Sequence, residues 1–249
     1  MVKEKPWHED DDFWELFGKV MFRPEALAAA VDDVDKIVTL LEIRPVALVL
    51  DLCCGVGRHS LELSRRGFNV TGVDRTRKYL EQARELADKE GLTIEFIEDD
   101  MRSFCRPETY DVIINMETSF SYFEDPQEDR QVVVNAFRSL KPGGRFLVEM
   151  HGKETLARIF TENNWQEIDG IFCLQERKVT HNWSWMENRW ILIDGDKRTE
   201  AKVTHRLYSA TEIISLMTDC GFSDVGVYGN LEGSPYNQKA SRMVVVARK

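Results

Sequence analysis

The sequence contains no long apolar run and few cysteines. No stretch approaches 18 uninterrupted apolar residues, so we expect no membrane-spanning helix. The N-terminus lacks the apolar segment of a signal peptide and soon becomes acidic. Five cysteines, of which Cys53 and Cys54 are adjacent, provide neither a disulfide framework nor the spacing of a zinc site. We therefore expect a cytoplasmic protein that binds no metal and no membrane.

Basic residues are the scarcer charge. The 33 lysines and arginines face 43 aspartates and glutamates, which gives a net charge of −10, and no basic run interrupts the mixture. A phosphate backbone repels such a chain unless a local basic patch compensates, so we expect no nucleic-acid partner. The hydrophobic fraction of 43% over 249 residues is sufficient for the core of one α/β domain with an elaboration.

Predicted strands and helices alternate between residues 46 and 149. Short apolar runs predict buried strands, and the amphipathic stretches between them predict helices. Alternation at this spacing indicates an α/β fold with a parallel sheet and right-handed crossovers. The predicted strands are 46–50, 69–73, 93–97, 110–114 and 145–149, and the predicted helices are 57–66, 76–90 and 126–140.

Both flanks of this core follow other patterns. Residues 10–22 form an amphipathic pattern with acidic residues at its start, where the helix dipole favours anions, and Pro24 opens a second helix. Residues 171–208 favour β-structure, and Asp194-Gly195 is a hairpin signal, so we interpret this segment as two or three antiparallel strands inserted into the sheet domain. The remaining predicted elements are helices at 153–162 and 210–220 and strands at 223–228 and 243–247.

These patterns divide the chain into three parts. Residues 1–42 are expected to form an N-terminal helical lid. Residues 43–152 and 209–249 are expected to form the sheet domain, which would carry the binding site. Residues 153–208 are expected to form an antiparallel β insertion that caps the site.

The most informative segment follows the first predicted strand. Asp51 ends this strand, and Cys53-Cys54-Gly55-Val56-Gly57 leads into a helix. Glycines let the backbone bend sharply and approach a ligand, and ligands bind at the carboxyl ends of such strands. Asp74 ends the second strand, where an acidic side chain can bind both ribose hydroxyls of a nucleoside. The combination predicts a nucleoside site.

Two residues argue against a dinucleotide. Ser60 stands where a dinucleotide fold requires its third glycine, and Asp51 places negative charge where a pyrophosphate would approach. A nicotinamide-dependent oxidoreductase is therefore disfavoured. S-adenosylmethionine carries a sulfonium and an ammonium group instead, and both suit an acidic rim.

The segment resembles motif one of the class I S-adenosylmethionine-dependent methyltransferases, of the small-molecule type. The resemblance covers residues 46–150 well and residues 206–248 in general pattern, and agreement of several separated motifs is more specific than any one of them. It implies a Rossmann-like, mostly parallel seven-stranded sheet with helices on both faces, whose last strand is antiparallel. It also implies S-adenosylmethionine as the cofactor and S-adenosylhomocysteine as the product.

The resemblance also assigns cofactor contacts. Asp74 would bind the ribose, Asp100 would bind the adenine amino group, and the Met101 backbone would lie beside the ring. The end of the fourth strand would line the methionine part of the cofactor. The full set of expected cofactor-binding residues is Asp51, Cys53, Gly55, Gly57, Asp74, Arg75, Asp100, Met101, Asn115 and Met116.

The chain departs from the family pattern at two positions. Cys53 replaces the first glycine of motif one and Arg58 replaces the third. A cysteine is small, so it is tolerated at the first position unless the backbone there requires a positive φ. Arg58 and His59 open a helix, and we expect both to be surface residues of its first turn.

Two residues are candidates for catalysis. His151 lies just after the fifth strand, on the ligand edge of the sheet, and is our candidate base for deprotonating an acceptor. The alternative is a surface histidine that hydrogen-bonds a loop. Tyr122 lies in the loop after the fourth strand and would orient the acceptor, or it is a half-buried aromatic residue of the core.

Aromatic residues supply the candidate acceptor contacts. Trp14 and Phe22 belong to an N-terminal aromatic cluster that fits either a lid over the site or an ordinary helix packed on the sheet. Trp183, in the β insertion, would wall an acceptor pocket or lie on one face of a plain strand. The loop 116–122 is similar to that of amino-sugar N-methyltransferases, although so short a likeness does not set the substrate.

We expect a methyltransferase that transfers a methyl group to a nitrogen or oxygen atom of a small-molecule acceptor. The alternatives are an RNA or protein methyltransferase, which the acidic composition disfavours, and a cofactor-binding regulatory protein without transferase activity. A mapped basic groove would support the former, and a filled acceptor pocket would support the latter.

Overall fold

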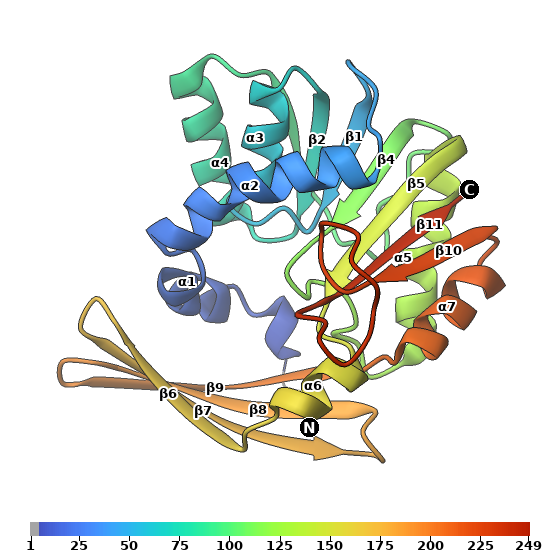
Figure 1. Cartoon of the computed structure of the whole chain (residues 1–249). Coiled ribbons are helices and arrows are strands. Elements are labelled where there is room, and N and C mark those ends of the chain that lie inside the picture. The colour runs from blue at the N-terminus through green and yellow to red at the C-terminus, as the bar shows by residue number, and fades with distance from the viewer. Residues whose placement is uncertain (1–4) are drawn as a thin grey trace.

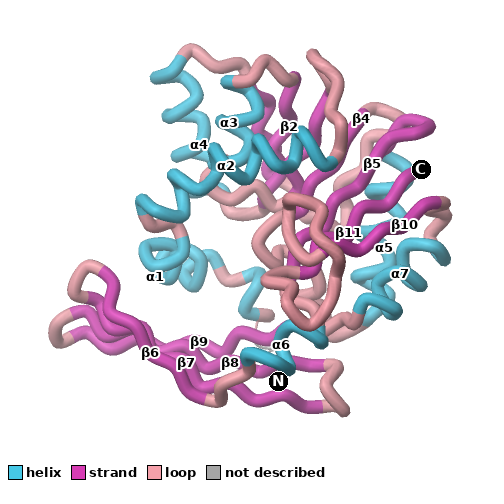
Figure 2. The backbone as a smooth tube through the Cα atoms, viewed as in Figure 1, coloured by secondary structure: helices cyan, strands magenta, loops and turns pink. Residues whose placement is uncertain are grey.

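A seven-stranded sheet forms the centre of the computed structural model, which describes residues 5–249 (Figures 1 and 2). The strand order is β10-β11-β5-β4-β1-β2-β3, and β11 runs antiparallel to both of its neighbours, β5 and β10. The seven strands and the antiparallel last strand confirm the predicted fold. The strands are β1 (Leu48–Leu52), β2 (Asn69–Asp74), β3 (Ile94–Glu98), β4 (Tyr110–Asn115), β5 (Leu140–Met150), β10 (Asp224–Tyr228) and β11 (Met243–Arg248).

Helices cover both faces of this sheet. Leu50 and Leu52 of β1 face a core that contains α5 (Pro126–Ser139) and α7 (Ala210–Asp219), whereas Val49 faces a second core that contains α2 and α3. The central strands are therefore apolar on both faces, as a covered parallel sheet requires. The helices on the second face are α2 (Pro24–Leu40), α3 (Arg58–Arg65) and α4 (Arg77–Glu90), of which α4 also contacts β3.

A separate antiparallel sheet follows β5 and the short helix α6 (Lys153–Ile159). Its strands pair in the order β6-β7-β8-β9, and Asp194 pairs with Lys197 at the predicted hairpin. The predicted antiparallel insertion after β5 is confirmed, and residues 171–208 form three strands, within the predicted two or three. The insertion also contains a fourth strand before residue 171, which was not predicted, and the four strands form a sheet of their own. The strands are β6 (Asn163–Ile168), β7 (Ile171–Thr180), β8 (Trp185–Asp194) and β9 (Lys197–Arg206).

The missed strand, β6, has a simple physical explanation. It lies at the sheet edge, and its first five residues are exposed, so it carries no apolar alternation. The prediction therefore began the β segment only at β7.

The first two helices of the chain lie between the two sheets. The short helix η1 (Trp7–Glu9) and α1 (Asp11–Met21) pack on the four-stranded sheet, where Phe13 and Phe17 of α1 share a core with Leu192 of β8. Figure 1 shows α1 below the seven-stranded sheet, on the side from which β5 leads into α6. We call η1, α1 and α2 the N-terminal cover.

None of the helices within residues 5–249 has both the length and the apolar character that crossing a bilayer requires. In the same residues, no group of three or more histidine, cysteine, aspartate or glutamate side chains is arranged to hold a metal ion.

Candidate active site

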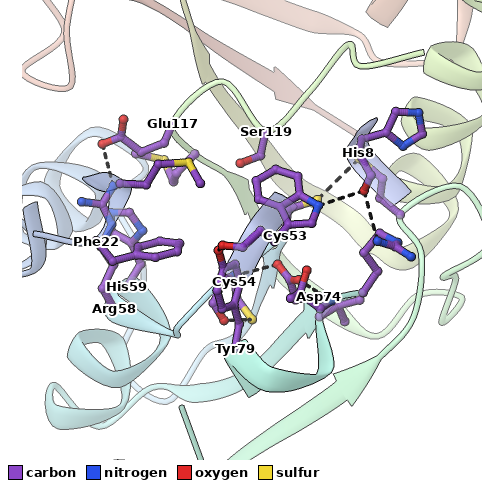
Figure 3. Close-up of a pocket in the computed structure, with 18 of the residues that line it drawn as sticks. His8, Phe22, Cys53, Cys54, Arg58, His59, Asp74, Tyr79, Glu117 and Ser119 are labelled. Carbon is purple, nitrogen blue, oxygen red and sulfur yellow. Dashed lines mark hydrogen bonds and ion pairs between the residues drawn. The ribbon is translucent and has the colours of Figure 1, made fainter. Parts of the chain in front are cut away.

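A cavity of about 530 Å³ lies at the carboxyl ends of β1, β2 and β3, beneath the N-terminal cover. Its wall has three parts, which Figure 3 shows in close-up. The strand-end side consists of Asp74, Asp99, Asp100 and Met101, which follow β2 and β3. The roof consists of Trp14 and Phe22 from the cover, Tyr122 from the loop after β4, and Trp190 from β8. The α2–α3 end consists of Arg23, Ala26, Arg58, His59 and Glu117.

The loop between β1 and α3 bends through three residues with positive φ: Cys53 (64°), Gly55 (56°) and Gly57 (77°). A Cβ atom at Gly57 would lie 2.9 Å from the Ala83 Cβ of α4, so glycine is required there for space as well as for φ. The backbone at Cys53 has a positive φ, which is the condition under which a cysteine at this position is strained. Cys53 adopts it with its sulfur 3.5 Å from that of Met101.

Asp74 is fixed by backbone donors. Its Oδ2 accepts a hydrogen bond from the Gly55 N–H at 2.8 Å, and its Oδ1 accepts one from the Thr76 N–H at 2.8 Å. Burial raises the pKa of this carboxyl group. Each oxygen retains acceptor capacity toward the cavity, so Asp74 can bind two adjacent hydroxyl groups while holding the motif-one loop in place.

Asp100 is joined to the N-terminal cover through Arg102. The Arg102 guanidinium donates to Asp100 at 2.6 and 2.9 Å, to Glu9 of η1 at 2.7 Å and to Glu128 of α5 at 2.8 Å. Burial acts to raise the pKa of Asp100, but the hydrogen bonds and charge of Arg102 outweigh it, so the pKa is lowered. This Arg102 network attaches η1 to the loop that follows β3.

Arg75 makes a second attachment at the same side. Its guanidinium donates to the His8 carbonyl oxygen at 3.1 Å and to Asp11 of α1 at 3.2 Å. The Trp14 indole N–H donates to the same carbonyl at 3.0 Å. The cover is therefore hydrogen-bonded to both loops of the strand-end side.

Aromatic rings close the roof. Tyr122 packs against Trp7 with ring centroids 4.8 Å apart, and Trp190 packs against Phe17 of α1 at 5.6 Å. Phe22 packs edge-on against Tyr79 at 5.0 Å, and a Cβ at Gly55 would meet the Phe22 ring at 3.1 Å. Burial raises the pKa of Tyr122, so its hydroxyl keeps its proton. The roof can hold an apolar or aromatic body and exclude water from it.

The α2–α3 end corrects two expectations. Arg58 and His59 are not surface residues, because α2 packs over the first turn of α3. Arg58 donates to the Ala26 carbonyl oxygen at 2.5 Å and to Glu117 at 2.6 Å. His59 is 4% exposed and lies 3.6 Å from the Asp33 carboxylate of α2.

Ten of the predicted site residues line the cavity, and five do not. Those on the wall are Cys53, Gly55, Asp74, Arg75, Asp100, Met101, Met116, Tyr122, Trp14 and Phe22. Those elsewhere are Asp51, Gly57, Asn115, His151 and Trp183.

Three of these five residues lie behind the wall, where they support it. Asp51 is 1% exposed and accepts a hydrogen bond from the Ser60 hydroxyl at 2.6 Å. Asn115 is fully buried and donates to the Leu52 carbonyl oxygen at 3.0 Å, which ties the end of β4 to that of β1. Gly57 caps α3.

His151 and Trp183 lie outside the cavity. The ring nitrogen Nε2 of His151 is bonded to the Arg242 guanidinium, which also pairs with Glu149 and the Thr118 hydroxyl. Burial, with the nearby Arg242 charge, lowers the pKa of His151 to about 4. Trp183 is 39% exposed in the turn between β7 and β8 and packs on Phe160 at 5.7 Å. Neither residue is presented to a ligand in the cavity.

The sequence analysis missed several wall residues. Trp190 lines the cavity, whereas the sequence analysis named Trp183 of the same β insertion as the acceptor contact. Arg23 had no local signal, since it lies between two helices in no motif. Asp99 could have been found, because it immediately precedes the predicted Asp100 at the end of β3.

Comparisons with known proteins agree with this geometry. Residues 49–144 match the methyltransferase domain family. YqeM of Bacillus subtilis (strain 168), a candidate methyltransferase, is 25% identical over 215 residues, which cover 81% of this chain and 83% of YqeM.

Two solved structures share the fold over nearly the whole chain. An S-adenosylmethionine-dependent methyltransferase from Clostridium acetobutylicum ATCC 824 has a TM-score of 0.76 at 17% identity, covering 96% of this chain and 98% of its own. CalS10, an amino pentose methyltransferase from Micromonospora echinaspora, has a TM-score of 0.66 at 20% identity and covers 94% and 95%. Residues 49–144 therefore carry the match to the methyltransferase domain family, and nearly the whole chain shares the fold of these S-adenosylmethionine-dependent methyltransferases.

Proposed function

We propose that the protein transfers the methyl group of S-adenosylmethionine to a nitrogen or oxygen atom of a small molecule bound under the roof. The observation that carries this proposal is that one cavity joins the strand-end side to an aromatic roof. Its volume of about 530 Å³ lies within the range of roughly 300–1,000 Å³ typical of small-ligand sites. We also propose three parts for the chain: an N-terminal lid (residues 1–42), a sheet domain that carries the site (residues 43–152 and 209–249), and a β insertion that caps it (residues 153–208).

The strand-end side fits the nucleoside part of the cofactor. Asp74 presents two oxygens that its backbone donors have already oriented, which suits a pair of ribose hydroxyls. Asp100 remains ionised because of Arg102 and can accept from an amino group. The loop at Cys53 and Gly55 leaves its backbone close to the cavity, where Asn115 and Asp51 hold the strand ends in place.

The roof positions the acceptor. The bound cofactor supplies an electrophilic methyl group, and the protein must align the acceptor atom with it and exclude water. Trp14 and Trp190 would hold the body of the acceptor, and Tyr122, which keeps its proton, would orient it by hydrogen bonding. A small molecule fits this enclosed site, and the amino pentose and sugar substrates of similarly folded enzymes support that class.

The side chains on the wall favour a nitrogen target. A neutral amine needs only to present its lone pair, whereas a hydroxyl group must also lose a proton to a base. Tyr122 retains its proton and His151 is outside the cavity. The histidines of the described wall are His8 and His59, of which His59 lies beside Asp33, and these two are the side chains available as a base to an oxygen acceptor.

The test combines binding with transfer. Calorimetric titration should show binding of S-adenosylhomocysteine, and radiolabelled S-adenosylmethionine should label members of a panel of small amines and hydroxyl compounds. Labelling of amines that persists both in His8→Gln and in His59→Gln would support a nitrogen target. A folded protein that binds neither form of the cofactor would contradict the proposal, and binding without labelling of any compound would point to the regulatory alternative.

A further inference from the structure

The end of β9 holds the loop after β4 on both sides of Tyr122. The Arg206 N–H donates to the Ser121 carbonyl oxygen at 2.7 Å, and the Ser121 hydroxyl donates to the Arg206 carbonyl oxygen at 2.9 Å. The Arg206 guanidinium donates to the Glu124 carbonyl oxygen at 2.7 Å. We call residues 121–124 the acceptor loop, because Tyr122 contributes to the roof of the cavity.

The backbone of the acceptor loop requires such contacts. Ser121 is 1% exposed and has a φ of 76°, a conformation that residues with a side chain keep only where their surroundings impose it. The Tyr122 ring packs against Trp7 and His8 of the N-terminal cover, with ring centroids 4.8 and 6.2 Å apart. The position of this ring therefore depends on the cover and on the contacts that hold the loop.

Asp129 of α5 anchors the Arg206 side chain to the sheet domain. Its Oδ2 accepts hydrogen bonds from the Arg206 Nε at 3.3 Å and from the Tyr208 hydroxyl at 2.8 Å. The Asp129 side chain is fully buried and that of Arg206 is 18% exposed, so water and salt screen this pair less than a surface pair. The guanidinium also lies over the Trp185 ring of β8 at 5.6 Å. Arg206 thus connects α5, the β insertion and the acceptor loop.

We propose that Arg206 is a positioning residue for methyl transfer, which, held by Asp129, fixes Tyr122 in the roof and so controls binding of the acceptor. The inference rests on the proposed function, in which Tyr122 orients the acceptor. Arg206 and Asp129 lie outside the described cavity wall, so they act through the acceptor loop. Because β9 pairs with β8, which carries Trp190, the same contacts place the loop relative to the β insertion.

Protonation of Asp129 gives these contacts a defined pH dependence. Burial raises the pKa of Asp129 to about 6, although the Tyr208 hydrogen bond and the Arg206 charge act to lower it. The other charged groups nearby are Glu128 on α5, which raises this pKa, and Glu212 of α7, which lies near Tyr208. Above about pH 6 the Asp129 carboxylate is charged and pairs with Arg206. Below that pH the pair is lost, and the acceptor loop is held less firmly.

The first test measures the acceptor loop without an acceptor. Arg206→Met keeps most of the side-chain volume but removes the donors, so hydrogen–deuterium exchange at residues 119–125 should accelerate at least about 3-fold. Calorimetry should show S-adenosylhomocysteine affinity within about 2-fold of the parent, because the strand-end side is unchanged. Arg189→Met is the matched control on the neighbouring strand β8, where its ion pairs lie among exposed side chains, and it should change neither quantity.

The second test follows Tyr122 itself by fluorine NMR of fluorotyrosine-labelled protein. The resonance that Tyr122→Phe lacks is assigned to Tyr122. In the parent this resonance should shift with a midpoint near pH 6, and Asp129→Asn, which keeps an acceptor oxygen but no titrating charge, should lose this step. His8 lies against the Tyr122 ring, and any step caused by its own titration would remain in Asp129→Asn.

The third test separates the two substrates. For an acceptor that the parent methylates, Arg206→Met should raise the KM of the acceptor about 5–10-fold and change that of S-adenosylmethionine less than about 2-fold. Arg206→Lys keeps a charge beside Asp129 but not the planar fork that reaches the loop, so its acceptor KM should lie between those of the parent and Arg206→Met.

Three results would overturn the inference. Arg206→Met could leave exchange at residues 119–125 unchanged, or the KM values of both substrates could rise equally, or the Tyr122 resonance could depend on pH alike in the parent and in Asp129→Asn. If Arg206→Met does not fold, the comparison of the parent with Asp129→Asn still decides. A parent protein that binds no S-adenosylhomocysteine contradicts the proposed function, whereas the exchange and NMR measurements need no cofactor and test the role of Arg206 separately.

Discussion

The strand-end side and the roof of the cavity are built in different ways. The strand-end side comes from residues that directly follow β2 and β3, so each functional side chain is placed by the strand before it. The roof brings Trp14 and Phe22 of the cover to Trp190 of β8, which are more than 160 residues apart in sequence. Local sequence therefore determines the first side, whereas packing between distant elements determines the second.

The largest effect is expected at Asp74. Asp74→Ala removes the acceptor for two backbone N–H groups and the proposed ribose contacts, each a hydrogen bond to a charged group worth about 1.5–3 kcal/mol. Calorimetry should show at least about a 100-fold loss of S-adenosylhomocysteine affinity. Asp196→Ala, in the exposed turn after β8, is the control and should bind normally. Undiminished binding by Asp74→Ala would show that the strand-end side does not hold the nucleoside.

The next prediction distinguishes Trp190 of β8 from Trp183 in the turn between β7 and β8. Trp190→Phe keeps a ring against Phe17 but shortens the roof, and should lower kcat/KM for an identified acceptor about 10-fold, because apolar contacts of this size contribute about 1–3 kcal/mol. Trp183→Phe should stay within about 2-fold, since it lies outside the cavity. Cofactor affinity should change little in either. The opposite order of effects would restore Trp183 as the acceptor contact.

The sequence predicted best those parts of the site whose residues directly follow a strand. The alternating pattern predicted five strands of the main sheet, and the pattern of the last residues predicted the other two. The glycine loop with Asp74 and Asp100 located the strand-end side. It failed where burial depends on packing between distant elements. His59 has an ordinary first-turn position until α2 covers it, and β6 has no apolar pattern because it lies at an exposed edge.

A variant of Arg102 tests whether the N-terminal cover is held in place by its contacts with the strand-end side. Arg102→Gln removes its pairs with Glu9, Asp100 and Glu128, which are partly exposed and worth about 0.2–1 kcal/mol each. Hydrogen–deuterium exchange of residues 7–21 should accelerate, and S-adenosylhomocysteine should dissociate about 5–10-fold faster. Arg77→Gln, whose ion pair lies within α4, is the control. Unchanged exchange would show that the aromatic packing alone holds the cover.

The same network should respond to pH in a defined direction. The hydrogen bond from Arg102 lowers the pKa of Glu9, and Arg102 likewise lowers that of Asp100 against the effect of burial. Groups whose folded pKa is depressed stabilise the fold above their unfolded pKa and lose this contribution as the pH falls through the folded pKa. In the parent, the protection factors of the cover, which correct exchange rates for the intrinsic pH dependence of amide exchange, should therefore fall below about pH 4. The protection factors of Arg102→Gln should depend less on pH.

The smallest effect is expected at Cys53, where the strand-end side departs from the family pattern. The φ of 64° costs an L-residue about 1–2 kcal/mol, so Cys53→Gly relieves strain. Glycine also makes the unfolded chain more flexible, at a cost of roughly 0.4–1 kcal/mol, and loses the contact with Met101. The two effects nearly cancel, and urea unfolding should change by less than about 1 kcal/mol. Cys53→Val should be clearly less stable, because a β-branched side chain disfavours positive φ. Equal stability of Cys53→Gly and Cys53→Val would show that the backbone at residue 53 relaxes when the side chain changes. The hydrogen bond from the Gly55 N–H to Asp74 would then be what holds the loop in place.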